Sequence, residues 1–282
     1  MRYGVNCSIM DELGDVRVLV ELAREAEAAG WDGFFIWDTL LFARQERQPL
    51  VDPWIALTAI AMSTERVRLG PMVTPLSRRR PWKLAREAVS LDHLSGGRLT
   101  LGVGSGDPKE GSFASFGEAT DPKVLAARLD EALAVLAGLW SGEPFSFHGE
   151  HYTVEENVFW PRPLQEPRIP IWVGGFWPHK PPFRRAARWD GVYPLTIVDG
   201  QIEMTPQILG EVAAFVKGRR TDDRPFDIVA SGWTSPDDAA GTREQLAAYA
   251  AAGATWWIEA LDGFRGPLAA LRRRIRQGPP KS

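Results

Sequence analysis

Residues 66–106 read RVRLGPMVTPLSRRRPWKLAREAVSLDHLSGGRLTLGVGSG, and this stretch decides the fold. It begins with an apolar run over 66–73, continues with an amphipathic segment over 81–95, and ends with a second apolar run over 98–104. Short apolar runs bounded by turn residues are typical of buried strands, and apolar positions three and four residues apart are typical of helices. The stretch therefore predicts a strand–helix–strand unit, which joins two parallel strands.

The same unit repeats along the whole chain. Eight strand candidates occur, at 2–7, 33–37, 66–73, 98–104, 169–174, 191–196, 226–231 and 255–261. Helical patterns separate them, at 16–30, 53–63, 81–95, 122–140, 206–217, 237–252 and 266–276, with a short proline-led helix after the fifth strand. Eight units over this length favour an α/β fold of the closed (β/α)8 type, a TIM barrel, over an open doubly wound sheet.

No linker or change of composition divides the chain, so we expect one domain over residues 1–282. Two insertions interrupt the regular alternation. One follows the fourth strand at 105–121, and the other precedes the fifth strand at 141–168. The second is expected to carry a small hairpin around Gly149.

Composition restricts the class of partner. The chain has 282 residues, 44% hydrophobic and 24% charged, and a formal net charge of -3, which gives no general attraction to nucleic acid or acidic membranes. Cys7 is the only cysteine, so no disulfide can form within the chain. No signal peptide and no apolar stretch of about 20 residues is seen, and we expect a cytoplasmic protein without nucleic-acid or membrane partners.

Four familiar motifs fail on their spacing. The run GVGSGD has Asp107 where a dinucleotide fingerprint needs its third glycine, and Ser112 stands where a P-loop needs lysine. Ser105 lacks the flanking glycines of a nucleophile elbow. The run HGEH at 148–151 fits no zinc pattern, so we expect a hairpin turn and no metal.

In a barrel the active site lies at the carboxyl ends of the strands, and this chain is polar there. The polar or glycine positions just past the predicted strands are Asn6, Ser8, Asp38, Thr39, Thr74, Ser105, Asp107, Gly174, Gly175, Thr196, Ser231, Thr234 and Glu259. The Gly174–Gly175 pair precedes a helix start and three cations, Lys180, Arg184 and Arg185, which suits a phosphate cradle. A tight turn that requires positive φ is the alternative.

Several segments together resemble the bacterial-luciferase-like flavin-dependent oxidoreductases. They are AEAAGWDGFFIWDT (26–39), residues 52–106, LWSGEPFSFHGEHYTV (139–154), IPIWVGG (169–175) and AARWDGVYP (186–194). They occur in family order over roughly the first 195 residues, and 66–106 is the most specific of them. The last third matches only in its alternation of strands and helices.

The resemblance implies a barrel that holds FMN or the deazaflavin F420 at its carboxyl end. Carried over by position, Gly174 and Gly175 would hold the phosphate, and Gly106 with Asp107 would line the ring edge. Relatives have a non-proline cis peptide at the end of strand three, which would fall at about Pro71–Met72 here. These residues, with Thr74 beside them, complete the expected cofactor-binding set.

The chain departs from the family at the end of strand two. Many relatives have Asp-His there, whereas this chain has Asp38-Thr39, and threonine cannot act as a base near neutral pH. The catalytic set is therefore Asp38 and Thr39, with Glu259 at the end of strand eight as the leading substitute for the histidine. His93 and His179 are further candidates by residue type.

Arg78, Arg79 and Arg80 follow strand three on the same rim as the expected cofactor. They could clamp an anionic substrate or cofactor group, or they could point to solvent or form ion pairs. We expect one functional arginine among them. Trp177 and Trp233 lie past strand ends and are assigned to an apolar substrate pocket.

The leading functional prediction is a luciferase-like monooxygenase that uses reduced FMN and oxygen on a small organic substrate, with the FMN supplied by a separate reductase. An F420-dependent hydride-transfer enzyme and a non-catalytic flavin-binding protein are the alternatives. A homodimer is an expectation from the resemblance.

Overall fold

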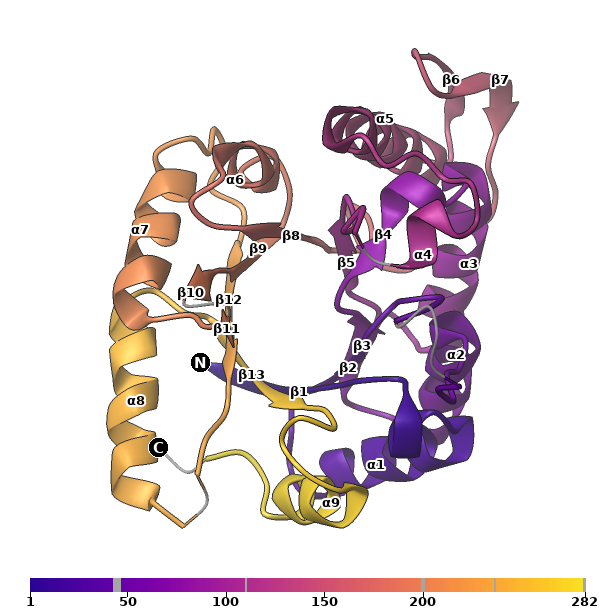
Figure 1. The fold of residues 1–282 in the computed structure, drawn as a ribbon. Helices are drawn as coiled ribbons and strands as arrows, with labels where there is room; N and C mark the ends of the chain where they lie inside the picture. Colours follow the sequence, from indigo (N-terminus) through magenta and orange to yellow (C-terminus); the bar gives the residue numbers. More distant parts are fainter. Residues whose placement is uncertain (43–46, 110, 199–200, 236, 281–282) are drawn as a thin grey trace.

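The computed structural model describes residues 1–42, 47–109, 111–198, 201–235 and 237–280. Within them, a ring of parallel strands is surrounded by helices (Figure 1). The strand order is β3-β2-β1-β13-β12-β9-β8-β5-β4. Their bounds are β1 Arg2–Cys7, β2 Gly33–Ile36, β3 Arg68–Pro71, β4 Thr74–Pro75, β5 Leu101–Gly104, β8 Ile171–Phe176, β9 Gly191–Leu195, β12 Asp227–Gly232 and β13 Trp256–Leu261. The predicted α/β barrel is confirmed.

The ring closes where the third barrel strand changes its partner. β3 pairs with β2, whereas β4, which resumes two residues later, pairs with β5. The Met72–Val73 peptide between β3 and β4 is cis. A parallel β-bridge joins Leu69 of β3 to Leu99, which lies two residues before β5. The predicted strand over 66–73 therefore corresponds to β3, and β4 begins one residue after its predicted end.

Helix starts follow the capping residues of the sequence. Asp52, Asp121 and Thr205 each accept hydrogen bonds from backbone N–H groups of the first turn, and each precedes a proline at the first helical position. The helices are α1 Val16–Ala28, α2 Pro53–Ser63, α3 Pro81–Leu94, α5 Pro122–Trp140, α6 Lys180–Ala186, α7 Pro206–Lys217, α8 Ala239–Ala251 and α9 Leu268–Arg276. The predicted bounds of α2, α5 and α7 are confirmed at both ends.

Both insertions lie where the sequence predicts. The first contains the short helix α4, Gly111–Ala114, and the second contains the hairpin of β6, Pro144–His148, and β7, Thr153–Val158. Glu131 of α5 accepts hydrogen bonds from the backbone N–H groups of Glu150, His151 and Tyr152, so the turn of the hairpin is fixed to α5. Short elements that the sequence did not indicate are η1 Asp11–Leu13, η2 Leu76–Arg78, and the hairpin of β10, Ile197–Val198, with β11, Gln201–Ile202.

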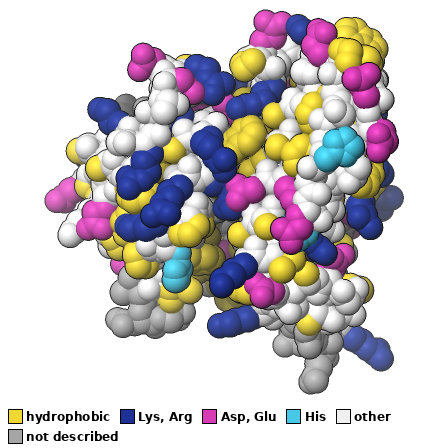
Figure 2. Space-filling model, turned by 90° about the horizontal axis from the view of Figure 1, so that it is seen from above, with side chains coloured by type: hydrophobic (Ala, Val, Ile, Leu, Met, Phe, Trp, Pro, Cys, Tyr) yellow, Lys and Arg dark blue, Asp and Glu magenta, His cyan; other side chains and the backbone are white. Residues whose placement is uncertain are grey.

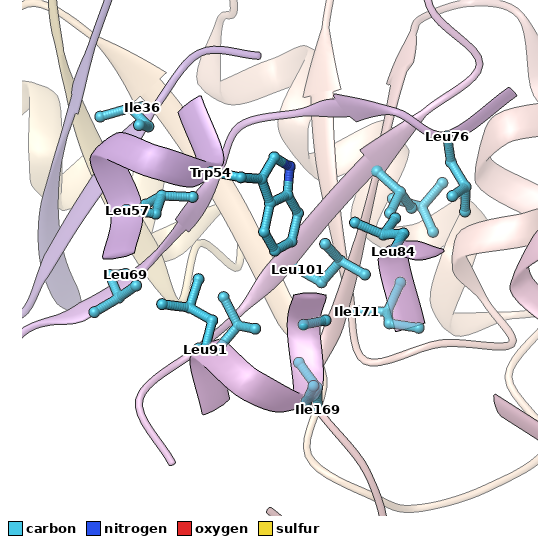
Figure 3. Close-up of a cluster of buried hydrophobic side chains, with 14 of the residues drawn as sticks. Ile36, Trp54, Leu57, Leu69, Leu76, Leu84, Leu91, Leu101, Ile169 and Ile171 are labelled. Carbon is cyan, nitrogen blue, oxygen red and sulfur yellow. The ribbon is translucent and has the colours of Figure 1, made fainter. Parts of the chain in front are cut away.

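The main core fills the space between the ring and the helices. Figure 3 shows Trp54 and Leu57 of α2 and Leu84 of α3 beside strand residues such as Leu69 and Leu101. Successive strand residues face opposite sides of a sheet, so the alternate residues point into the ring. A second cluster fills it, with Phe35, Met72, Trp172, Tyr193, Val229, Trp256 and Ile258. This alternation decides which side chains can reach a ligand at the carboxyl end.

Among the described residues, no helix is both long and apolar enough to cross a membrane. The assignment of residues 1–282 to one domain stays a prediction.

Candidate functional site at the carboxyl ends of the strands

The inner face of β1 ends in a buried amide. A Cβ placed on Gly4 would lie 2.8 Å from Ile258 Cδ1 and 3.2 Å from Phe35 Cε2, which are both inside the ring, so Gly4 and Asn6 face inward. Asn6 is 4% exposed, and its Oδ1 has no hydrogen-bond partner among the residues that the structure describes. A buried acceptor without a donor is costly, which marks Asn6 as a group that a ligand can satisfy.

A wall without side chains lies on the other side of the ring. A Cβ on Gly102, Gly104 or Gly174 would lie 3.2, 3.1 or 3.2 Å from a methyl group of Val73. The Val73 side chain therefore lies against three glycines of β5 and β8. Such a surface presents backbone rather than side chains to the inside of the barrel.

The order of the strands sets the glycine wall against a polar one. Counting around the closed ring, with β3 and β4 as one strand, β1 is opposite β8 and β13 is opposite β5. The polar wall has Asn6 on β1, Ser231 on β12 and Asp262 directly after β13, and Tyr193 on β9 borders the glycine wall because it pairs with Gly174. The Tyr193 hydroxyl lies 3.2 Å from Ser231 Oγ, and burial raises the pKa of Tyr193, so this phenol keeps its proton near neutral pH.

Asp262 is a buried carboxylate with one oxygen fixed. Its Oδ1 accepts hydrogen bonds from the backbone N–H groups of Phe264 at 3.0 Å and Arg265 at 3.3 Å. The residue is 8% exposed. Burial raises the pKa of this carboxyl group, and the two backbone hydrogen bonds and the charge of Arg265 only partly oppose that rise.

Asp38 is the centre of an ion-pair cluster. Its carboxylate accepts hydrogen bonds from Thr74 Oγ1 at 2.7 Å, Arg78 at 3.1 Å, and Arg79 at 2.8 and 3.0 Å. The Asp38 side chain is fully buried. Predicted catalytic and anion-binding residues, 40 positions apart in sequence, thus meet at the end of β2.

Thr39 joins the loop after β2 to the first insertion. Its Oγ1 lies 2.9 Å from Ser112 Oγ of α4, and Ser112 Oγ also accepts hydrogen bonds from the backbone N–H groups of Leu40 and Leu41. Thr39 therefore connects two loops at the carboxyl end of the barrel.

The remaining predicted anion and substrate residues lie away from this centre. Arg80 is exposed, with its guanidinium 5.9 Å from the Trp82 ring. The Trp177 ring packs edge-on against Phe183 of α6 and Phe215 of α7. Trp233 is 51% exposed. None of these contacts supports an apolar substrate pocket, because Trp177 lies among helices and Trp233 faces solvent.

The glycine pair lies in a strand rather than in a turn. Gly174 and Gly175 lie within β8, paired with Tyr193 and Pro194 of β9, so the interpretation as a positive-φ turn is wrong. Gly174 faces inward to Val73, whereas a Cβ on Gly175 would lie 2.3 Å from Pro182 Cβ in α6. Gly175 is thus required by the close approach of α6.

The cations near this pair are mostly engaged. Lys180 Nζ lies 3.0 Å from the Trp177 ring centroid, and Arg185 forms an ion pair with Asp130. Arg184 is exposed on α6. Figure 2 shows the molecule from above, which is the side near which α6 lies in Figure 1. Several Lys and Arg side chains gather on this face. The phosphate site at Gly174 and Gly175 stays a prediction.

The other predicted cofactor residues lie partly inside the ring and partly in the loop after β5. Pro71 ends β3, and Met72 belongs to the inner cluster. The cis bond joins Met72 to Val73, one residue later than expected, because the extended pairing with β2 continues through Pro71. Gly106 has φ +79°, and a Cβ there would lie 2.2 Å from the Phe113 ring. Asp107 is exposed and accepts a hydrogen bond from the Lys109 N–H.

Glu259 faces the outside of the ring. It is 0% exposed, and its donors are Thr234, through the backbone N–H and Oγ1, with Trp257 Nε1, Arg265 and Arg274. Trp257, on the same face of β13, packs with α7 and α8 in a third apolar cluster. Since Glu259 shares the outer face of β13 with Trp257 and five donor groups hold its two oxygens, the geometry does not support the predicted proton transfer at the barrel centre.

The predicted histidines have structural surroundings. His93 Nε2 lies 2.8 Å from the Arg162 carbonyl oxygen, and His179 is the exposed N-cap residue of α6. His148 and His151 belong to the hairpin, as predicted. In the described ranges, no group of three or more His, Cys, Asp or Glu side chains is arranged to hold a metal.

Sequence reasoning missed several residues of the site, among them Asp262, Tyr193 and Val73. Asp262 directly follows the predicted strand over 255–261 and could have been found by extending the strand-end rule by one position. Tyr193 and Val73 gave no such signal, because both lie inside apolar predicted strands.

Comparisons with known proteins identify relatives of the chain. The model of the family described as luciferase-like monooxygenase matches residues 1–278. An uncharacterised protein of Mycobacterium tuberculosis is 31% identical over 201 residues, which are 65% of this chain and 67% of that protein. A protein of Beutenbergia cavernae named F420-dependent glucose-6-phosphate dehydrogenase is 36% identical over 162 residues, which are 54% of this chain and 45% of that protein.

Solved structures share the fold. An F420-dependent secondary alcohol dehydrogenase, in complex with an F420-acetone adduct, aligns with a TM-score of 0.77 and 16% identity, over 99% of this chain and 98% of that one. A monooxygenase from Streptomyces bottropensis aligns with a TM-score of 0.73 and 19% identity, over 98% of this chain and 97% of that one.

Proposed function

The chain belongs to the luciferase-like monooxygenase family. We propose that the carboxyl end of its barrel binds the flavin-type ring of FMN or F420, and that the protein acts as an oxidoreductase on a small organic molecule. The membership agrees with the resemblance in the sequence. The identity of the ring and of the substrate are parts of the proposal.

The observation that carries the proposal is the pair of unlike walls. Gly102, Gly104 and Gly174 leave a backbone surface around Val73, and Asn6 offers an unpaired acceptor from the opposite side. A planar heterocycle has two flat faces and polar N–H and C=O groups on its edge. The residues therefore fit such a ring: Val73 and the glycines would contact it, and Asn6 Oδ1 would accept a hydrogen bond from one of its N–H groups.

Asp38 and its partners would fix the rim of the site. The Asp38 carboxylate holds Arg78 and Arg79, so their guanidinium groups are oriented before any ligand arrives. When bound, the ring would supply the two-electron chemistry, and the chain would bind it, orient it and exclude water. Gly106 would let the chain turn past the ring edge.

Two chemistries fit this site. The first is monooxygenation with reduced FMN and oxygen, which the description of the matching family favours. The second is hydride transfer with F420, which the name of the relative that is 36% identical favours. A separate reductase, which the first chemistry needs, and a homodimer remain proposals, as does a cytoplasmic location. A non-catalytic flavin-binding role is the third candidate, and the engaged Thr39 is its only support.

Titration of the purified protein with FMN, anaerobically reduced FMN and F420 separates these candidates. Tight binding of reduced FMN supports monooxygenation, and tight binding of F420 alone supports hydride transfer. Turnover of any substrate removes the non-catalytic role. Failure of all three to bind would contradict the proposal.

Gly174→Val tests where the ring binds. The new side chain would fill the wall beside Val73, so the affinity for the ring should fall at least tenfold while the fold is kept. Gly210→Val in α7 is the matched control, because a Cβ there has no neighbour closer than Ala252 Cβ at 4.0 Å. Equal affinities of the two variants would place the ring elsewhere.

A further inference from the structure

The residues assigned to the proposed function so far include no group that can take up and return a proton near neutral pH. Thr39, at the family's histidine position, has no such chemistry. Four carboxylates are buried among the described residues: Asp38, Asp92, Glu259 and Asp262. A proton-exchanging group must face the inside of the barrel and must have an oxygen that no cation or side-chain donor holds.

Three of the four carboxylates fail this requirement. Asp38 is held by Thr74 and two arginines. Asp92 lies on α3 and accepts hydrogen bonds at both oxygens from the backbone and side chain of Gln165 and from the backbone of Leu164. Glu259 faces outward and contacts two arginines. Each of these carboxylates connects parts of the fold.

Asp262 meets the requirement. Within the described part of the chain, its donors are two backbone N–H groups, and both bind Oδ1. Ile258 faces the inside of the ring, and Ala260 and position 262 follow it at the spacing of two that keeps side chains on one face. Asn6 pairs with Ala260 across the β1–β13 ladder, so its orphaned Oδ1 is on the adjacent strand.

We propose that Asp262 Oδ2 takes up and returns a proton of the molecule bound at the carboxyl end of this barrel, in place of the family histidine that Thr39 replaces. This inference rests on the proposed function. The molecule would carry a hydroxyl or a ring N–H near Asn6. When its O–H or N–H bond breaks, the electron pair stays on that oxygen or nitrogen, and the proton forms a new bond to Oδ2. Return of the proton reverses both changes.

The surroundings suit this exchange. Three titratable or charged groups interact electrostatically with Asp262. They are Arg265 in its own loop, Tyr193 on β9, and Cys7 on β1. Burial raises the pKa values of both Tyr193 and Cys7, so these groups stay neutral. Arg265 is engaged with Glu259 and with the Thr234 carbonyl oxygen. Burial raises the pKa of Asp262 above its ordinary value, which makes the carboxylate a better proton acceptor.

Asp262→Asn is the decisive variant, because an amide oxygen can still accept both backbone hydrogen bonds but the group cannot titrate. Asp121→Asn is the matched control. Asp121 is an exposed carboxylate that also accepts hydrogen bonds from two backbone N–H groups, those of Lys123 and Val124. Circular dichroism and thermal unfolding first establish that both variants fold.

The first readout needs no turnover. Isothermal titration of the ring that binds the wild-type protein, FMN or F420, is repeated across pH. A ligand that contacts Oδ2 favours one protonation state, so binding must be linked to a proton. On one side of the pKa of Asp262, the Kd of the wild-type protein and of Asp121→Asn should change tenfold per pH unit. The plot of Kd against pH should lack this sloping limb for Asp262→Asn. Carboxyl signals in NMR spectra should show the same titrating group and its loss.

The second readout is the pH profile of turnover. Asp262→Asn should lose at least 100-fold in kcat and the limb that the carboxyl group causes, as expected for loss of a general acid–base group. Persistence of the binding limb or the turnover limb in Asp262→Asn would overturn the role of Asp262. Failure of the wild-type protein to bind either ring would instead overturn the proposed function, so the two failures are distinguishable.

Discussion

The outer and inner faces of the barrel wall differ although they are built from neighbouring residues. Glu259 and Asp262 are both buried acids at the end of β13. Glu259 faces outward and is bound by four residues, whereas Asp262 faces inward and is bound by two backbone N–H groups at one oxygen. The contrast teaches that the partners of a buried acid, rather than its burial, separate a structural role from a chemical one.

The glycine pair of β8 shows the same contrast. Gly175 faces outward and is required by Pro182 of α6, whereas Gly174 faces inward and lies directly against Val73. Residues that are adjacent in the chain thus serve the packing of the helix layer and the surface of the candidate site.

The sharpest test of the comparison is Glu259→Gln. The substitution leaves the guanidinium groups of Arg265 and Arg274 buried without their carboxylate. Loss of one partner of a buried ion pair costs about 3–5 kcal/mol, so the free energy of unfolding should fall by that amount. Urea denaturation measures it. A loss below about 1 kcal/mol would mean that the outer network contributes no stability.

A second test compares Gly175→Ala with Gly174→Ala. The Cβ on Gly175 would lie 2.3 Å from Pro182 Cβ, so β8 or α6 must shift, at a cost of about 1–3 kcal/mol. The Cβ on Gly174 would lie 3.2 Å from a Val73 methyl group, which can move by a few tenths of an ångström. Thermal unfolding should therefore show the larger loss for Gly175→Ala. The reverse order would contradict the assignment of the two faces.

A third test uses the pH dependence of stability. Burial raises the pKa of Asp262 above its ordinary 3.8, so the folded protein binds a proton that the unfolded chain has already lost. The free energy of unfolding therefore falls as pH rises from the unfolded pKa through the folded one, by about 1.4 kcal/mol for each tenfold difference in proton affinity. Asp262→Asn should lack this fall. Parallel curves of stability against pH would count against the raised pKa.

The smallest effect is expected on the solvent side of the helix layer. Asp130 of α5 pairs with Arg185, whose side chain is 6% exposed, and with Arg188, whose side chain is 65% exposed. Arg188→Ala should change the free energy of unfolding by less than about 1 kcal/mol, because water screens an exposed pair. Arg185→Ala is the control and should cost more. Equal losses of stability in the two variants would show that the exposure of an arginine does not determine how much its ion pair with Asp130 contributes.

The sequence alone determined the barrel, most helix bounds and the rim on which the site lies. The helix starts at Pro53, Pro122 and Pro206 were predictable because a capping residue and a proline fix the first turn locally. The barrel was predictable because eight alternating units leave few ways to bury their apolar faces.

Only the tertiary structure decided which strand-end residues reach the inside of the ring. The fifth strand runs over Ile171–Phe176 rather than 169–174, which places Gly175 in the ladder beside Gly174 rather than after the strand. The side-chain direction alternates with every residue, so an error of one position in a strand reverses its face. Asp38 meets Arg78 and Arg79, and Asn6 pairs with Ala260, through contacts between distant parts of the chain. Local sequence patterns carry no record of such contacts, because the closure of the ring creates them.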